Sequence, residues 1–227
     1  MEDARAIDHA LSLCYALEAA CLVPLWIGDL LAAERSVAML LDHSARHALT
    51  VWHARGRCLN GVLLIKRGAV GGGLPLLRDA LDELRETGFV PHHTALLGTL
   101  AQGLAGSGEI AQGLVTIDEA LARSERDEEH WCIAELLRIK GELVLLEGAP
   151  GAASGAEEHF QYALHWTRQQ GILSMELRCA TGLARLWHAQ GRPEPARELL
   201  APLYGRFTEG FDTADLKDAA KLLSELA

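Results

Sequence analysis

Ten histidines make a metal site the first chemistry to consider in this sequence. His43 and His47 stand four residues apart and can share one face of a helix, and His53 and Cys58 follow them. A zinc site usually needs four ligands, with pairs at short spacing on a turn. This set shows no such pair. We therefore interpret these histidines as packing or solvated side chains and predict no metal site.

Catalytic motifs are not found either. Asp42, His43 and Ser44 are the residue types of a hydrolase triad, but neighbours on a helix point about 100° apart and cannot form a relay. The sequence has no GxSxG elbow and no GxxxxGK[ST] phosphate loop. The glycines at 71–73 are interpreted as a flexible turn rather than an anion site. These observations predict no catalytic residues, no cofactor and no enzymatic activity.

The elements that carry these residues follow a repeat. Glycines recur at a period of 40 residues, and the fifth follows after 43 because of an insertion around residues 150–152. Small and large apolar residues keep the same register around them, which makes chance an insufficient explanation. The columns are the glycines (Gly28, Gly68, Gly108, Gly148, Gly191), small residues before them (Cys21, Gly61, Ala101, Gly141, Ala184), small residues after them (Ala33, Gly73, Gly113, Ala156, Ala196) and large apolar residues (Val37, Leu77, Ile117, Phe160, Leu200).

These columns therefore predict that each unit is a helical hairpin. The recurrent glycine ends one helix, small residues on both sides let two antiparallel helices approach, and the large apolar residue fills the gap between them. Such a hairpin must stack on its neighbours to bury its apolar face. No sustained period-two alternation predicts a strand. Pro24 is expected to shorten the first helix, and Pro75 to disturb the second helix of its unit.

This pattern resembles the tetratricopeptide (TPR) family, with repeats longer than the standard 34 residues. The resemblance implies an all-α, right-handed solenoid over residues 1–227. We expect hairpins at about 5–45, 46–88, 91–126, 129–171 and 173–206, followed by a capping helix at about 212–226.

The last part of the sequence shows a more specific resemblance. The runs LRIKGEL at residues 137–143, ELRCATGLARLW at 176–187 and FTEGFDTADLK at 207–217 are similar to the C-terminal repeat region of large bacterial signalling proteins. In that family a nucleotide-cyclase or winged-helix module and an ATPase precede the repeats. The resemblance implies a bacterial signalling or transcription-regulatory scaffold, without the catalytic modules.

Composition limits the partners. Asp and Glu number 31 against 21 Lys and Arg, which gives a net charge of −10 and argues against direct nucleic-acid binding. No stretch is expected to be long and apolar enough for a membrane helix, and the acidic start of the chain is unlike a signal peptide. The five scattered cysteines are interpreted as reduced, mostly buried thiols. A cytoplasmic location is the expectation.

Solenoids of this kind bind partners along the concave side, which the first helix of each hairpin lines. The repeat register assigns the following candidates to that groove: Tyr15, Arg55, Gln102, Glu135, Arg138, Glu142, Arg178, Arg185 and His188. Arg138, Arg178 and Arg185 have two interpretations. They are ordinary solvated charges paired with Glu135, Glu142 and Glu176, or they form a cationic patch for a carboxylate-bearing peptide.

The sequence thus predicts a protein-interaction or regulatory scaffold that binds a peptide or protein partner, such as an ATPase, cyclase or regulator module. The alternative is a small-molecule sensor that controls a linked or separate ATPase or cyclase through the same groove.

Overall fold

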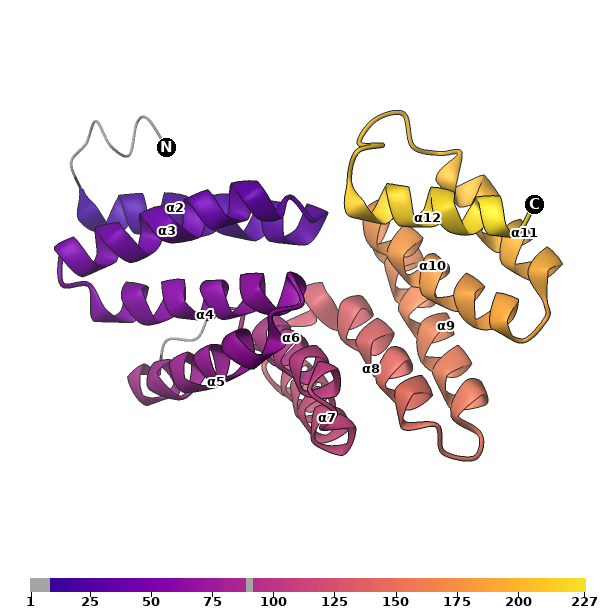
Figure 1. Cartoon of the computed structure of the whole chain (residues 1–227), viewed down its shortest axis with the longest axis horizontal. Helices are drawn as coiled ribbons and strands as arrows, with labels where there is room; N and C mark the ends of the chain where they lie inside the picture. Colours follow the sequence, from indigo (N-terminus) through magenta and orange to yellow (C-terminus); the bar gives the residue numbers. More distant parts are fainter. Residues whose placement is uncertain (1–8, 89–91) are drawn as a thin grey trace. The chain divides into compact units, whose positions relative to one another are not determined.

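The computed structural model describes residues 9–88 and 92–227. These residues form eleven α-helices, one short 3₁₀ helix and no strand, which confirms the all-α prediction (Figure 1). The helices are α2 (Ala10–Ile27), α3 (Leu30–Arg46), α4 (Thr50–Lys66), α5 (Val70–Thr87), α6 (His93–Gly106), α7 (Ile110–Arg126), η1 (His130–Cys132), α8 (Ile133–Glu147), α9 (Ala152–Gln170), α10 (Leu173–Ala189), α11 (Pro193–Tyr204) and α12 (Ala214–Glu225).

The chain divides into two compact units, Met1–Gly103 and Leu104–Ala227. In the first unit, α2 packs against α3, α3 against α4, and α4 against α5. In the second unit, α7 packs against α8 and α8 against α9, while α10 contacts α8, α9, α11 and α12. Sequential helices therefore pack as antiparallel pairs within each unit. The expectation of a single domain over residues 1–227 stays a prediction.

The recurrent glycines end the first helix of each pair, as predicted. Gly28, Gly68, Gly108, Gly148 and Gly191 all have positive φ angles, between 69° and 89°. This left-handed conformation strains any residue with a Cβ, which explains why glycine recurs there. The insertion in the fourth unit adds a second left-handed glycine, Gly151, directly before α9.

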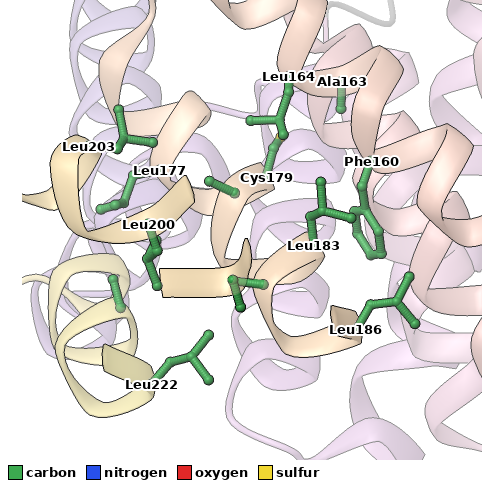
Figure 2. Close-up of a cluster of buried hydrophobic side chains, with 14 of the residues drawn as sticks. Phe160, Ala163, Leu164, Leu177, Cys179, Leu183, Leu186, Leu200, Leu203 and Leu222 are labelled. Carbon is green, nitrogen blue, oxygen red and sulfur yellow. The ribbon is translucent and has the colours of Figure 1, made fainter. Parts of the chain in front are cut away.

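The predicted columns form the core. In the large apolar column, Val37, Leu77, Ile117, Phe160 and Leu200 are each at most 2% exposed. In the second unit, Phe160 of α9 lies beside Leu183 of α10 and Leu164 of α9 lies beside Cys179, and Leu200 and Leu222 extend this cluster to α11 and α12 (Figure 2). Repeated burial of the same column in successive pairs is what holds each unit together.

Two expectations about local structure are wrong. Pro24 does not shorten α2, which continues to Ile27 and ends at Gly28, where the Asp29 N–H bonds the Pro24 carbonyl. Pro75 lies inside the second helix of its unit, as predicted, and this helix, α5, continues to Thr87. The glycines at 71–73 are not a flexible turn but belong to the first turns of α5, where Gly73 is buried against α4.

The expectation about membrane-length segments is also wrong. One described helix, α2, is long and apolar enough to cross a membrane by length and composition. Core helices of soluble proteins and signal sequences meet the same criteria, so this is weak evidence. Here Cys14, Leu17, Cys21 and Leu25 of α2 are buried within the first unit.

Candidate partner-binding site

The structure places all nine predicted groove residues on the first helices of their pairs. Tyr15 lies on α2, Arg55 on α4 and Gln102 on α6, all within the first unit. The other six, Glu135, Arg138, Glu142, Arg178, Arg185 and His188, lie on α8 and α10 of the second unit. Each set is therefore a separate candidate surface.

In the first unit, Tyr15 is accessible and Gln102 is half-buried. The Tyr15 ring is 57% exposed and meets the buried Trp52 edge-on, with ring centroids 4.5 Å apart. An aromatic ring held by a second ring offers an apolar contact at low entropic cost.

Arg55 does not line a groove, contrary to the prediction, because its side chain is completely buried. Its Nε donates to Glu18 Oε1 at 2.6 Å, and its Nη2 lies 3.0 Å from His92 Nδ1. A guanidinium can be buried only when a carboxylate compensates its charge. Glu18 supplies that charge, and it is the single charged residue in the sequence of α2. That isolated acid was the signal in the sequence for a buried ion pair.

In the second unit, Arg138 is nearly buried between two carboxylates of its own helix. Its Nε and Nη2 donate to the two oxygens of Glu135, each at 2.9 Å, and its Nη1 donates to Glu142. Burial alone would lower the pKa of Arg138, but Glu135 and Glu142 more than offset this and raise the pKa. The side chain is therefore a fixed, fully charged part of the surface.

Arg178 of α10 extends this network to the C-terminal helix. Its Nε and Nη2 donate to the two oxygens of Asp215 in α12, at 3.0 and 2.7 Å, and its Nη1 lies 3.5 Å from Glu135 Oε1. Burial lowers the pKa of Arg178, and Glu135 and Asp215 together raise it above its ordinary value. One turn further along α12, Asp218 pairs with Arg185.

We name these seven side chains the α8–α10–α12 network: Glu135, Arg138, Glu142, Arg178, Arg185, Asp215 and Asp218. Three arginines thus meet four carboxylates. The geometry favours the paired interpretation of the arginines, with one correction: Glu176 pairs with Arg168 and Arg206 instead. Asp215 and Asp218 were expected only as part of a cap, because nothing local in the sequence indicates which earlier helix α12 covers.

Within this network, Arg185 and its partner Asp218 keep the most access to solvent, followed by Glu142. The side chains of Arg185, Asp218 and Glu142 are 49%, 43% and 38% exposed. Burial raises the pKa of the Glu142 carboxyl despite the nearby Arg138. His188 lies three residues beyond Arg185 on α10 and is exposed. The side chains of Arg185, Glu142 and His188 can contact a partner without unfolding of the protein.

The histidines considered as metal ligands take part in packing contacts. His43 is buried, with its Nε2 3.0 Å from the Ala10 carbonyl oxygen and its ring against that of His47. His53 Nδ1 lies 3.3 Å from the Ser44 hydroxyl. In the part of the chain that the structure describes, no three His, Cys, Asp or Glu side chains are grouped to hold a metal ion.

Comparisons with known proteins give a structural likeness only. No family model matches the chain, and no curated protein matches it. It is similar to the nearly identical TPR-like repeats assigned to a kinesin light chain of Podosopora anserina, with 18% identity and a TM-score of 0.53 over 87% of this chain and 95% of that chain. A variant of those repeats gives 17% identity and a TM-score of 0.53, over 84% and 92%. The chain thus has a TPR-like α-helical repeat fold.

Proposed function

We propose that this chain is a protein-interaction module of a bacterial cytoplasmic signalling or transcription-regulatory system, and that it binds a peptide or protein segment rather than catalysing a reaction. The TPR-like fold supports the general role, since stacked helical pairs offer extended binding surfaces. The bacterial signalling setting is supported by the sequence resemblance of residues 137–143 and 176–217.

The observation that carries the proposal is the α8–α10–α12 network. Arg138 and Arg178 are held by two or more carboxylate contacts each, so the helices that bear the accessible Arg185 and Glu142 are fixed before a partner arrives. Side chains that are already ordered lose less entropy when they bind. Arg185 and Glu142 present opposite charges, which suits a segment that carries both an acidic and a basic group.

Binding at Arg185 involves competition within the chain. Asp218 of α12 already pairs with Arg185, so an acidic group of the partner must replace this carboxylate or share the guanidinium with it. The pair is half-exposed, and such pairs contribute at most about 1 kcal/mol. Exchange of one carboxylate for another is therefore energetically accessible.

The test is a selection from a random peptide library on the intact chain, followed by affinity measurement of the selected peptide by calorimetry. We expect Arg185→Ala to weaken binding by about tenfold or more, because a charged hydrogen bond contributes about 1.5–3 kcal/mol. Arg197→Ala is the matched control, since Arg197 is exposed on α11 outside the first-helix surface. Equal affinities for the wild type and Arg185→Ala would refute this site.

A further inference from the structure

Two arginines share one buried carboxylate at the start of α10. Glu176 lies in the first turn of α10, and its side chain is only 10% exposed. Arg168 Nε donates to Glu176 Oε1 at 2.8 Å, and Arg206 Nη1 donates to Glu176 Oε2 at 3.3 Å. Arg168 lies in the last turn of α9 and Arg206 follows the end of α11, so the ends of two helices meet at this carboxylate. We call Arg168 and Arg206 the arginine pair.

The arginine pair carries more positive charge than Glu176 neutralises. Among the described residues, each of the two guanidinium groups forms an ion pair with Glu176 alone. The neighbouring residues 169–175 and 207–208 are all uncharged. One carboxylate therefore meets two cations, on a chain whose net charge is −10. A local excess of positive charge on an acidic protein favours an anion from outside the chain.

Both guanidinium groups also keep free hydrogen-bond donors. Arg168 uses its Nε on Glu176, which leaves Nη1 and Nη2, and Arg206 uses its Nη1, which leaves Nε and Nη2. Each arginine thus retains two adjacent nitrogens, the arrangement that binds two oxygens of one anion. The side chains are 55% and 59% exposed, so an anion in solution can reach these donors.

The arginines of the α8–α10–α12 network have no such donors left. Arg138 places all three of its nitrogens on Glu135 and Glu142. Arg178 likewise directs its three nitrogens to Asp215 and Glu135. The free donors therefore distinguish the arginine pair from the more deeply buried arginines of the same unit.

We propose that the arginine pair binds a phosphomonoester group. Such a group has three terminal oxygens and a charge of about −1.5 to −2 at pH 7, so it can accept hydrogen bonds from both arginines. A carboxylate has only two oxygens, which a single guanidinium group can satisfy. Glu176 orders both arginines before the ligand arrives, which lowers the entropic cost of binding. A phosphorylated protein segment and a small phosphate compound both carry this group, and the test separates these two sources.

A second pair of arginines provides a matched control. Arg123 and Arg126 each place their Nε 3.1 Å from an oxygen of Asp127. Three glutamates, at positions 125, 128 and 129, adjoin this pair in the sequence, so its surroundings are acidic. Arg126 has the same free nitrogens as Arg168, but without the local excess of positive charge. We expect it to bind no phosphate.

The test is a titration of the intact chain with a capped pentapeptide that carries a central phosphoserine between alanines. The side-chain Nε resonances of the arginines are followed by NMR, and those of Arg168 and Arg206 should shift. Arg206→Gln leaves Arg168 to compensate Glu176, so the fold should be kept while binding weakens by about tenfold or more. Arg126→Gln should bind the peptide as the wild type does. The same peptide with glutamate in place of phosphoserine should bind at least about tenfold more weakly.

A parallel titration with inorganic phosphate identifies the source of the group. Tighter binding of the phosphopeptide would assign the site to a phosphorylated protein segment, and equal affinity would assign it to a small phosphate compound. Unmoved Arg168 and Arg206 resonances, equal affinity for the glutamate peptide, or unchanged affinity of Arg206→Gln would each overturn the proposal. Arg185 lies nine residues beyond Glu176 on α10, about 14 Å along the helix, so these outcomes are independent of the proposed function.

Discussion

Gly61 and Leu77 bring α4 and α5 into backbone contact. A Cβ added to Gly61 would lie 2.8 Å from the Leu77 Cβ and 2.9 Å from the Leu77 nitrogen. The facing Gly73 is equally confined, since a Cβ there would lie 2.8 Å from the Gly61 carbonyl oxygen. Helices α4 and α5 can therefore pack this closely only because Gly61 and Gly73, which face each other, both lack side chains.

Gly61→Ala should destabilise the first unit. The added methyl meets backbone atoms, which cannot move aside as a flexible side chain would, so the two helices must separate. Overpacking of this kind typically costs about 1–3 kcal/mol. The measurement is the urea dependence of the helical circular dichroism signal, from which the free energy of unfolding is obtained.

Gly72→Ala is the control for that experiment. A Cβ at Gly72 meets no heavy atom within 4 Å, and the residue lies in α5. Alanine favours a helix over glycine by up to about 1 kcal/mol, so this variant should be as stable as the wild type or more so. If both variants lost the same stability, the assignment of Gly61 to a helix–helix contact would be wrong.

The repeat columns were predictable because each one repeats the same physical requirement five times. A left-handed turn after the first helix needs glycine, and close packing needs a small residue; both requirements leave a mark on residue type. Pro24 was misjudged because proline removes one hydrogen bond without dictating a helix end. The last residues of α2, after Pro24, are stabilised by the burial of Leu25, which no local sequence pattern reveals.

Glu18→Gln should destabilise the first unit strongly. The variant keeps the size of the side chain but removes the carboxylate that compensates the fully buried Arg55. An uncompensated buried charge typically costs about 3–5 kcal/mol. A fall of this size in the free energy of unfolding, measured in urea, is the expected result.

Glu83→Gln provides the comparison. Glu83 of α5 pairs with Arg57 at 2.6 Å, and Arg57 lies on α4, the helix that also carries Arg55. Both side chains of this pair are partly exposed. Surface pairs contribute up to about 1 kcal/mol, so this variant should lose little stability. Similar losses for the two variants would mean that burial does not distinguish the Glu18–Arg55 pair.

The candidate site was predictable only in part, because some of its ion pairs join helices that are far apart in the sequence. Periodicity placed Arg138, Arg178 and Arg185 on first helices, and their helical neighbours Glu135 and Glu142 were foreseeable as i, i+3 and i, i+4 partners. The pairing of Arg178 with Asp215 and of Arg185 with Asp218 joins helices far apart in sequence. Such contacts depend on how α12 packs on α10, which residue spacing does not encode.

Leu216→Ala should loosen the C-terminal helix. Leu216 is 3% exposed and packs in the core of the second unit, so its truncation removes buried surface and leaves a cavity. Such changes typically cost about 2–5 kcal/mol. Lys217→Ala, at the exposed next position, should change the free energy of unfolding by less than about 0.5 kcal/mol. Equal melting temperatures for Leu216→Ala and the wild type would show that α12 does not stabilise the unit.

Removal of residues 212–227 should have a larger effect than Leu216→Ala. It exposes the apolar surface of α10 and α11 that α12 covers and leaves Arg178 and Arg185 without Asp215 and Asp218. We expect a lower melting temperature and aggregation at concentrations where the full chain is soluble, measured by light scattering. Unchanged melting and solubility would contradict the capping role of α12.

The buried cysteines should make the free energy of unfolding depend on pH in the alkaline range. All five are free and buried, as the sequence predicted. Burial raises the pKa of the Cys58 thiol to about 12, with smaller opposing and reinforcing effects of nearby charges, and raises that of Cys21 to about 12 as well. Between pH 9.0, the ordinary pKa, and about 12, the unfolded chain loses these protons while the folded chain keeps them.

Stability should therefore fall as pH rises above 9.0, because the folded state binds more protons than the unfolded state. Each such thiol costs about 1.4 kcal/mol per pH unit until its own folded pKa is reached. Cys58→Ala should lower stability at neutral pH through the lost side-chain volume, yet show a shallower decline above pH 9.0 than the wild type. The free energy of unfolding in urea at a series of alkaline pH values provides both slopes. Parallel slopes for the wild type and Cys58→Ala would show that the Cys58 thiol ionises equally in both states.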